Sequence, residues 1–207
     1  MTEQSELPRF VGMVLVLLIP SFVLWMLISP WLAGPAVWVC DALFTLWMPE
    51  VVDSVQLRGT QALVMTLYGE LDGAVVTAAQ AGSQMGFPVD VRLLSYSIPF
   101  YAALHFSTPQ SGGFSSFGWG LWVLYPLIIL GLVCVCLKNL MMGLGVPFFA
   151  QSAAFVPSGH AIGLVYQLSI LIVPPLAPIL LWAWQARETP LLKQFSRTSS
   201  TGPKIPE

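Results

Sequence analysis

The sequence predicts an integral membrane protein, mainly α-helical, with about four transmembrane helices and a small β-containing extracytoplasmic subdomain between the first and the second. Three stretches without a formally charged side chain predict this fold class. They lie between Arg9 and Asp41, between Arg92 and Lys138, and between Lys138 and Arg187, and they are 31, 45 and 48 residues long. Charged side chains are costly in hydrocarbon, so charge-free runs of this length are typical of membrane helices. Only 9% of all residues are charged, against roughly 25% in a soluble domain.

Residues 10–34 form the first predicted transmembrane helix, after a short cytoplasmic N-terminus at residues 1–9. The apolar run from Phe10 to Leu32 gives about 35 Å of helix, enough to cross a hydrocarbon core of about 30 Å. A signal peptide is the alternative, because Arg9 precedes the run. The run is longer than a signal-peptide core and lacks a clean small-residue cleavage site, so we expect an uncleaved anchor.

Residues 35–49 remain apolar but are interrupted by Pro35, Asp41 and Pro49. Because proline lacks a backbone donor, Pro35 predicts a break after the first span. The segment is too short to cross the membrane again. We therefore expect a separate interfacial helix that lies along the membrane surface.

Residues 50–92 form the one sizeable hydrophilic region, predicted to be an extracytoplasmic β-hairpin subdomain. Apolar and polar residues alternate over 55–58 and again over 63–68, on either side of the Gly-Thr pair at 59–60. Alternation with a period of two around a glycine turn predicts a hairpin. Residues 89–91 add a predicted third strand.

Residues 93–110 are short for a membrane span. They reach a sufficient length only if Arg92 and residues beyond His105 contribute at the two edges. We favour a second transmembrane helix here, and a re-entrant segment is the alternative. After the polar loop at 107–116, residues 117–138 form a full third span.

The remaining chain divides into three predicted parts. Residues 139–157 are interrupted by glycines and are expected to be extracytoplasmic or interfacial. Residues 158–186 form the fourth transmembrane helix, kinked because three prolines between 174 and 178 remove backbone donors. Residues 187–207 are polar and are expected to form a disordered cytoplasmic tail.

The distribution of charge predicts the orientation. Residues 41–92 contain six acidic and two basic side chains, whereas the tail contains Arg187, Lys193, Arg197 and Lys204. Positively charged segments remain in the cytoplasm, which places both termini inside and residues 35–92 outside. Two cytoplasmic termini require an even number of crossings, in agreement with four.

The string Pro157-Ser158-Gly159-His160 is the sharpest chemical motif. The same four residues occur in the type-2 phosphatidic acid phosphatases, where the histidine protonates a leaving group. That family also needs an upstream basic clamp and a downstream nucleophilic histidine. Here Lys138 lacks the arginine partner, and no histidine follows His160. We therefore favour the interpretation that Ser158 caps a helix and His160 lies at the wet interface.

Three residues remain candidates for catalysis: His160, Lys138 and Asp41. Lys138 closes the third span and is expected to extend to the headgroups, while a position at the edge of an apolar stretch explains Asp41 equally well. His105 is expected to be an interfacial residue that ends a short helix. With two histidines, no catalytic, metal or cofactor site can be assembled from the sequence, and a net charge of −2 gives no reason to expect nucleic-acid binding.

Taken together, the layout resembles a known family. The end of the first span at residues 24–35, the segment after the strands at residues 89–100 and the final helix at residues 166–182 carry the resemblance. Over about residues 10–186 the chain resembles the exosortase H-associated membrane proteins, small bacterial polytopic proteins that accompany an exosortase. The resemblance implies a multi-pass protein of the bacterial inner membrane, with residues 35–92 in the periplasm.

The resemblance further implies a role beside a sortase-like membrane enzyme that processes proteins bearing a C-terminal sorting signal. Exosortases use a membrane cysteine with a later arginine and histidine, and Cys40, Arg92 and His105 do not match that arrangement. We favour a non-catalytic accessory protein that contacts membrane lipids and binds the exosortase or its substrates. The alternatives are a structural subunit of a larger cell-envelope complex, or a membrane enzyme that acts on a lipid-linked group through His160.

Overall fold

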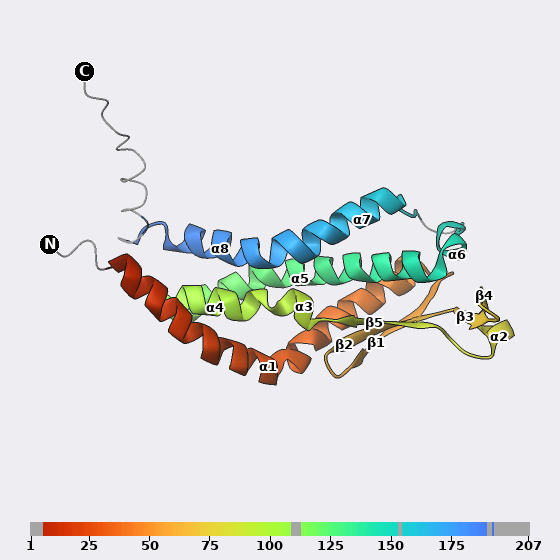
Figure 1. The fold of residues 1–207 in the computed structure, drawn as a ribbon, viewed down its shortest axis with the longest axis horizontal. Coiled ribbons are helices and arrows are strands. Elements are labelled where there is room, and N and C mark those ends of the chain that lie inside the picture. Colours follow the sequence, from red (N-terminus) through yellow and green to blue (C-terminus); the bar gives the residue numbers. More distant parts are fainter. Residues whose placement is uncertain (1–5, 109–112, 153–154, 190–191, 193–207) are drawn as a thin grey trace, which may run out of the picture. The chain divides into compact units, whose positions relative to one another are not determined.

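The computed structural model describes residues 6–108, 113–152, 155–189 and 192. Its helices are α1 (Glu6–Trp47), α2 (Ala78–Ala81), α3 (Arg92–Ser95), α4 (Ser97–Ser107), α5 (Gly113–Leu144), α6 (Val146–Phe149), α7 (Gly159–Gln167) and α8 (Val173–Ala186). Its strands are β1 (Val52–Arg58), β2 (Gln61–Thr66), β3 (Tyr68–Leu71), β4 (Ala74–Thr77) and β5 (Gly86–Asp90), and Figure 1 shows these elements. The predicted disorder of the tail falls almost wholly outside these residues.

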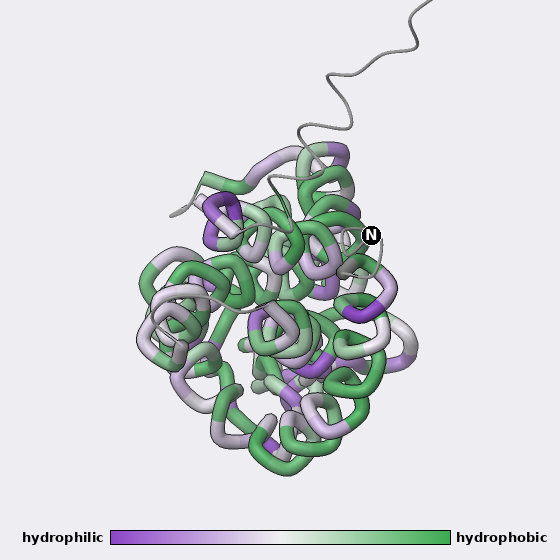
Figure 2. The backbone as a smooth tube through the Cα atoms, turned by 90° about the vertical axis from the view of Figure 1, so that its left-hand side faces the viewer, coloured by the Kyte–Doolittle hydropathy of each residue, from purple (hydrophilic) through white to green (hydrophobic). Residues whose placement is uncertain are grey.

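Three helices are long and apolar enough to cross a membrane: Leu7–Trp47, Gly113–Leu144 and Gly159–Ala186, with 41, 32 and 28 residues. Figure 2 shows hydrophobic residues along much of the backbone of the described chain. These helices and the small sheet region confirm the predicted class of a mainly helical membrane protein. At about 1.5 Å per residue, each helix is longer than a hydrocarbon core of about 30 Å.

The chain divides into two compact units. Unit 1 comprises Met1–Met26, Ser97–Leu124 and Pro175–Glu207, and so contains the start of α1, α4, the start of α5 and most of α8. Unit 2 comprises Leu27–Tyr96 and Tyr125–Pro174, which hold the end of α1, all strands, the end of α5, α6 and α7.

In unit 2, α1 continues as one helix through Pro35 to Trp47, where we had expected a break and a separate interfacial helix at 35–49. The Tyr125 hydroxyl donates a hydrogen bond of 2.8 Å to the carbonyl oxygen of Leu32, the residue after Trp31, whose carbonyl Pro35 leaves without its helical donor. The helix also buries a stripe of side chains at helical spacing, Ala33, Ala36, Val37, Cys40 and Phe44, and Met48 directly after the helix is buried too. This stripe stabilises the helix beyond the proline.

The predicted hairpin is confirmed. Strands β1 and β2 pair in antiparallel fashion up to Arg58 and Gln61, so a two-residue Gly-Thr turn joins them. Gly59 has a positive φ of 64°, which glycine adopts at little cost. The predicted third strand is also present: β5 pairs with β2 from Gly86 to Asp90 and completes a sheet of order β1-β2-β5.

A second hairpin, β3–β4, was not predicted. Its strands pair from Tyr68 and Thr77 to Leu71 and Ala74, so Asp72 and Gly73 form its turn. Both turn residues have positive φ, 53° and 79°. The Asp-Gly dipeptide is a strong sequence signal for such a turn, and the Gly-rich composition of the surrounding segment obscured it.

The sheet packs on the helices of unit 2. The ring of Phe87 in β5 lies where a side chain at Gly143 of α5 would be. Glu50 accepts hydrogen bonds from the backbone and hydroxyl of Ser152, at 3.0 and 2.9 Å. The core of the subdomain therefore includes helical residues as well as strands, and Val64, Leu140 and Phe148 in it are fully buried.

Helix boundaries differ from the prediction at the third span, whereas the fourth predicted span, residues 158–186, agrees with the helical stretch Gly159–Ala186. Helix α5 begins at Gly113 and continues to Leu144, beyond the expected end at residue 138. Ser158 caps α7 as predicted, because its hydroxyl accepts from the backbone of Ala161. A π-helical segment, Leu168–Ile172, follows α7 and precedes the prolines of α8. A π-helical segment is a recognised cause of helix bending, and the kink expected at the prolines stays a prediction.

Candidate functional site

A polar cluster lies inside unit 1, among apolar and aromatic side chains. Tyr101 and His105 of α4 are one helical turn apart and therefore share a face. Both are buried, with 0% and 2% of their surface exposed. The Tyr101 ring stacks on Phe117 of α5 at 5.4 Å between centroids. Gly120 leaves the space for its hydroxyl, since a Cβ at this position would overlap the Tyr101 hydroxyl.

Gln185 of α8 connects the two side chains of α4 to α5. Its amide nitrogen donates to the carbonyl oxygen of Ser116 at 3.0 Å. Its amide oxygen accepts from the Tyr101 hydroxyl at 2.6 Å and faces His105 Nδ1 at 3.2 Å. His105 Nε2 faces the carbonyl oxygen of Gly113 at 3.0 Å. Each polar group of the cluster thus has a partner, which offsets the free-energy cost of its burial.

A second polar contact joins Thr108, the residue after α4, to α8. The indole nitrogen of Trp182 donates to the Thr108 hydroxyl at 2.9 Å, and this hydroxyl donates to the carbonyl oxygen of Leu104 at 3.1 Å. The Trp182 ring also stacks on Phe10 of α1, with 5.3 Å between centroids. Unit 1 is therefore held by buried hydrogen bonds together with aromatic packing.

The sequence did not reveal this cluster. His105 does lie in the last turn of α4, as expected, but it is buried where we had expected an interfacial position. A tyrosine and a histidine four residues apart in an apolar segment share a helical face, and this spacing was the available signal. Their partner Gln185 is 80 residues further along the chain and no local pattern points to it.

The catalytic candidate Asp41 forms a hydrogen bond to the backbone. Its Oδ1 accepts from the amide of Val55 at 2.6 Å, so α1 covers the outer edge of strand β1. The Thr45 hydroxyl donates to the carbonyl oxygen of Asp41 at 2.7 Å. This carboxylate satisfies an amide that an edge strand leaves unpaired.

The other two candidates do not join Asp41. The Lys138 ammonium lies over the ring of Tyr166, 5.4 Å from its centroid, and contacts Asn139 at 3.5 Å. His160 lies exposed in the first turn of α7. Across the part of the chain that the structure describes, no hydrogen bond or ion pair connects any two of the three candidates. They remain separate candidates.

Among the described residues, no group of three or more histidine, cysteine, aspartate or glutamate side chains is placed to hold a metal ion. Cys40, Cys134 and Cys136 are buried free thiols.

The family described as exosortase H-associated membrane protein matches residues 4–189, nearly the whole chain. The chain belongs to this family. It is accordingly a membrane protein associated with exosortase H, in agreement with the resemblance in the sequence. Comparisons with curated proteins and with solved structures give no match. All of unit 2 and the whole Tyr101–His105–Gln185 cluster lie within the part of the chain that the exosortase H-associated family covers.

Proposed function

We propose that the protein is a non-catalytic accessory subunit of an exosortase-type sorting system and acts by binding the exosortase or its substrates. The membership of the exosortase H-associated family carries this proposal. The geometry of Asp41 and Lys138 supports it, because their charged groups contact the protein's own backbone and aromatic ring. The contacts of these two charged side chains within the protein therefore explain their presence without a bound substrate.

We infer a bacterial inner-membrane protein with four crossings and both termini in the cytoplasm. The three long helices supply three crossings, and the segment of α3 and α4 supplies the fourth. Helix α4 alone has 11 residues, about 16 Å, which is shorter than the hydrocarbon core. Burial of Ser97, Ile98, Tyr101 and Leu104 supports its placement among other helices, where a short span can be accommodated.

The periplasmic part in this proposal comprises residues 35–92 and the helix ends that pack on them. Asp41 of α1 accepts a hydrogen bond from the Val55 amide of β1, and the Phe87 ring of β5 packs closely against Gly143 of α5. These two contacts support a subdomain that is held firmly on its helices. Glu70 and Asp72 are exposed at the β3–β4 hairpin. A firmly held, polar surface of this kind suits recognition of a protein partner, because little conformational freedom is lost on binding.

Co-purification with site-specific cross-linking tests the proposal. A photo-crosslinking residue is placed at exposed Glu70 or Gln56, with exposed Leu15 of α1 as the matched control, and the chain is co-expressed with the exosortase and a sorting substrate. We expect the exosortase or the substrate to co-purify and to cross-link from the sheet region but not from Leu15. Recovery of the folded protein without either molecule would refute the binding role.

Substitution of His160 separates the binding role from the enzymatic alternative. His160 is exposed on α7, so His160→Ala is expected to leave both the amount of folded protein and substrate sorting unchanged. Loss of sorting with a normal amount of folded His160→Ala protein would instead favour the enzyme. Reporter fusions after residue 80 and after residue 189 test the orientation, and a cytoplasmic signal from the first fusion would overturn it.

A further inference from the structure

A single charged side chain lies between Arg92 and Arg187 in the sequence, and it belongs to Lys138 of α5. This lysine is half-buried in a helix that is long and apolar enough to cross a membrane. Its ammonium lies over the ring of Tyr166, 5.4 Å from the centroid, and 3.5 Å from the side-chain oxygen of Asn139. Both partners are uncharged. Among the described residues, no carboxylate forms an ion pair with Lys138, whereas charged side chains in membrane helices commonly pair with an opposite charge.

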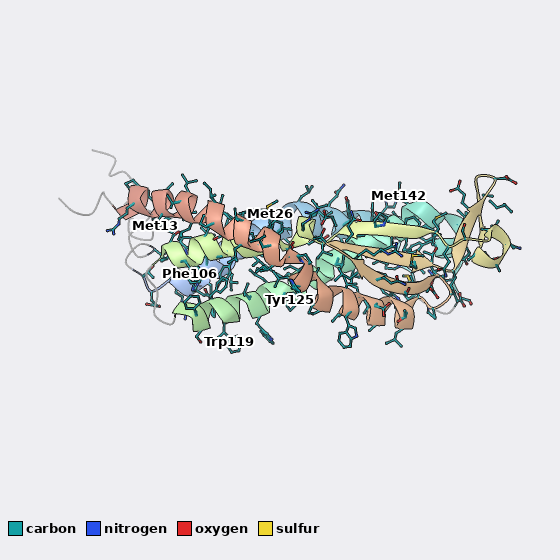
Figure 3. All side chains as sticks on the ribbon, turned by 90° about the horizontal axis from the view of Figure 1, so that it is seen from below. Met13, Met26, Phe106, Trp119, Tyr125 and Met142 are labelled. Atoms are coloured by element: carbon teal, nitrogen blue, oxygen red, sulfur yellow. The ribbon has the colours of Figure 1, made fainter. Side chains whose placement is uncertain are left out.

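Helices α5 and α7 of unit 2 run antiparallel, as two contacts show. Gly159 at the start of α7 lies next to Met141 of α5. Two turns further along α7, Tyr166 lies next to Lys138, which is one turn nearer the start of α5. Met142, one turn after Lys138, is 69% exposed (Figure 3). Lys138 therefore lies where the contact between α5 and α7 meets the exposed face of α5.

The same side of this helix pair presents an open space and an unpaired amide on α7. Because the two right-handed helices are antiparallel, the flank of α7 beside Lys138 is the one that carries Gly163 and Gln167. A Cβ at Gly163 would meet open space, with nothing within 4 Å. Gln167 is exposed, and in the described part of the chain its side-chain amide has no hydrogen-bond partner. Leu164 and Leu171, one turn before and one turn after Gln167, are exposed as well, so this amide lies within an apolar surface.

We propose that Lys138, Gly163 and Gln167 form a docking surface for an apolar helix of the exosortase, and that this helix carries a carboxylate that pairs with Lys138. The inference rests on the proposed binding role and specifies where in the membrane the binding takes place. An acidic side chain on the incoming helix supplies the charge that Lys138 lacks. Gly163 lets the two backbones approach closely, and Gln167 forms a hydrogen bond with a polar group of the incoming helix.

Two other occupants leave part of this surface unexplained. A second copy of this chain would have to supply the acid. Asp41 is the one carboxylate within the three long apolar helices that the structure describes, and it already accepts from the Val55 amide. A lipid phosphate would neutralise the Lys138 ammonium but would leave the Gln167 amide, between two exposed leucines, without a partner.

Photo-cross-linking of the full-length protein, co-expressed with the exosortase, tests the surface. The cross-linking residue replaces Leu164, on the flank of Gln167, or Val165 as the matched control, which is also exposed but lies on the opposite side of α7. We expect the exosortase to cross-link from Leu164 and not from Val165, through an apolar peptide that contains an aspartate or a glutamate. Equal cross-linking from the two positions, or an exosortase peptide without an acidic residue, would overturn the proposal.

Substitutions test the charge and the open space separately. Lys138→Gln removes the charge and should lower the recovery of the exosortase by at least about tenfold, whereas Lys138→Arg should retain most of it. Gly163→Leu fills the open space and should also lower the recovery, while Val165→Leu on the opposite side should not. Lys138→Glu, combined with a lysine in place of the acid in the cross-linked exosortase helix, should restore binding. Failure of this charge reversal to restore binding would refute the ion pair.

The outcomes separate this inference from the binding role on which it rests. Unchanged recovery of the exosortase with folded Lys138→Gln and Gly163→Leu would refute the docking surface and leave the binding role intact, as would recovery of a sorting substrate alone. Recovery of neither molecule with the wild type would refute both. Native mass spectrometry that shows less bound anionic phospholipid in Lys138→Gln, with unchanged exosortase recovery, would assign Lys138 to a lipid phosphate instead. The Tm in detergent shows whether each variant is folded, and if Lys138→Gln does not fold, the cross-linking from Leu164 decides.

Discussion

The hydrogen bond between Asp41 and Val55 gives the most specific prediction about how the sheet is attached to α1. Asp41→Ala removes the acceptor of an amide that lies 2.6 Å from Oδ1 and belongs to a buried residue. Loss of one partner of a buried hydrogen bond costs about 1–3 kcal/mol. Taking about 2 kcal/mol, and about 1.4 kcal/mol for each factor of ten, local opening at Val55 becomes about 30-fold more frequent.

Hydrogen exchange of the Val55 amide, followed by mass spectrometry or NMR in detergent, measures this change directly. Asp41→Asn keeps an oxygen acceptor without the charge, so a smaller increase is expected. Asp53→Ala, at an exposed position of the same strand, is the matched control and should change the stability by less than about 0.5 kcal/mol. Unchanged Val55 exchange in Asp41→Ala would refute the assigned role and restore Asp41 as a candidate for chemistry.

Three further predictions concern packing, backbone satisfaction and pH. Gly143→Ala places a Cβ in the space of the Phe87 ring of β5 and should lower the stability of the protein by about 1–3 kcal/mol. Gly163→Ala is the control, because its Cβ meets open space, and it should raise the stability by up to about 1 kcal/mol. Equal changes of Tm in detergent for the two variants would contradict this packing. Tyr125→Phe removes the hydroxyl that donates to Leu32 of α1 and should lower the free energy of unfolding, measured with a chemical denaturant, by about 0.5–1.5 kcal/mol. An unchanged free energy of unfolding would show that the hydroxyl does not support the helix. The hydrogen bond from Arg92 lowers the pKa of Asp90, so the stability from this pair is present above the ordinary aspartate pKa and is lost as the pH falls below about 4. Arg92→Gln should flatten that acid limb in a fluorescence-monitored titration; an unchanged limb would argue against the pair.

The hairpin and the helix cap were predictable because their signals are local. Alternating side chains around Gly59 specify two strands and their turn, and Ser158 supplies a cap within three residues of the amide that it binds. The second hairpin carried an equally local signal at Asp72 and Gly73, which was overlooked. By contrast, the break expected at Pro35 did not occur, because Tyr125 and the buried stripe on α1 support the helix from a distance.

The polar cluster of Tyr101, His105 and Gln185 could not be predicted for a related reason, because its members come from distant segments of the chain. Tyr101 and His105 are one turn apart, but whether such a pair faces water or the protein interior depends on what covers it. The covering groups come from α5 and from Gln185 of α8. The sequence pattern of one helix cannot predict that Gly120 of α5 leaves space for the Tyr101 hydroxyl of α4, because that contact depends on how the two helices pack.

The sequence by itself determined that the chain belongs in a membrane, where its long apolar runs lie and where its one hydrophilic region falls. Those properties are sums over neighbouring residues, so the solvent preference of each segment follows without knowledge of its partners. Only the tertiary structure decided that Asp41 secures a strand, that α1 continues through its proline and that His105 is buried against two acceptor oxygens. Each of these outcomes depends on a hydrogen bond between groups distant in sequence, and its free energy exists only after the helices and strands have packed.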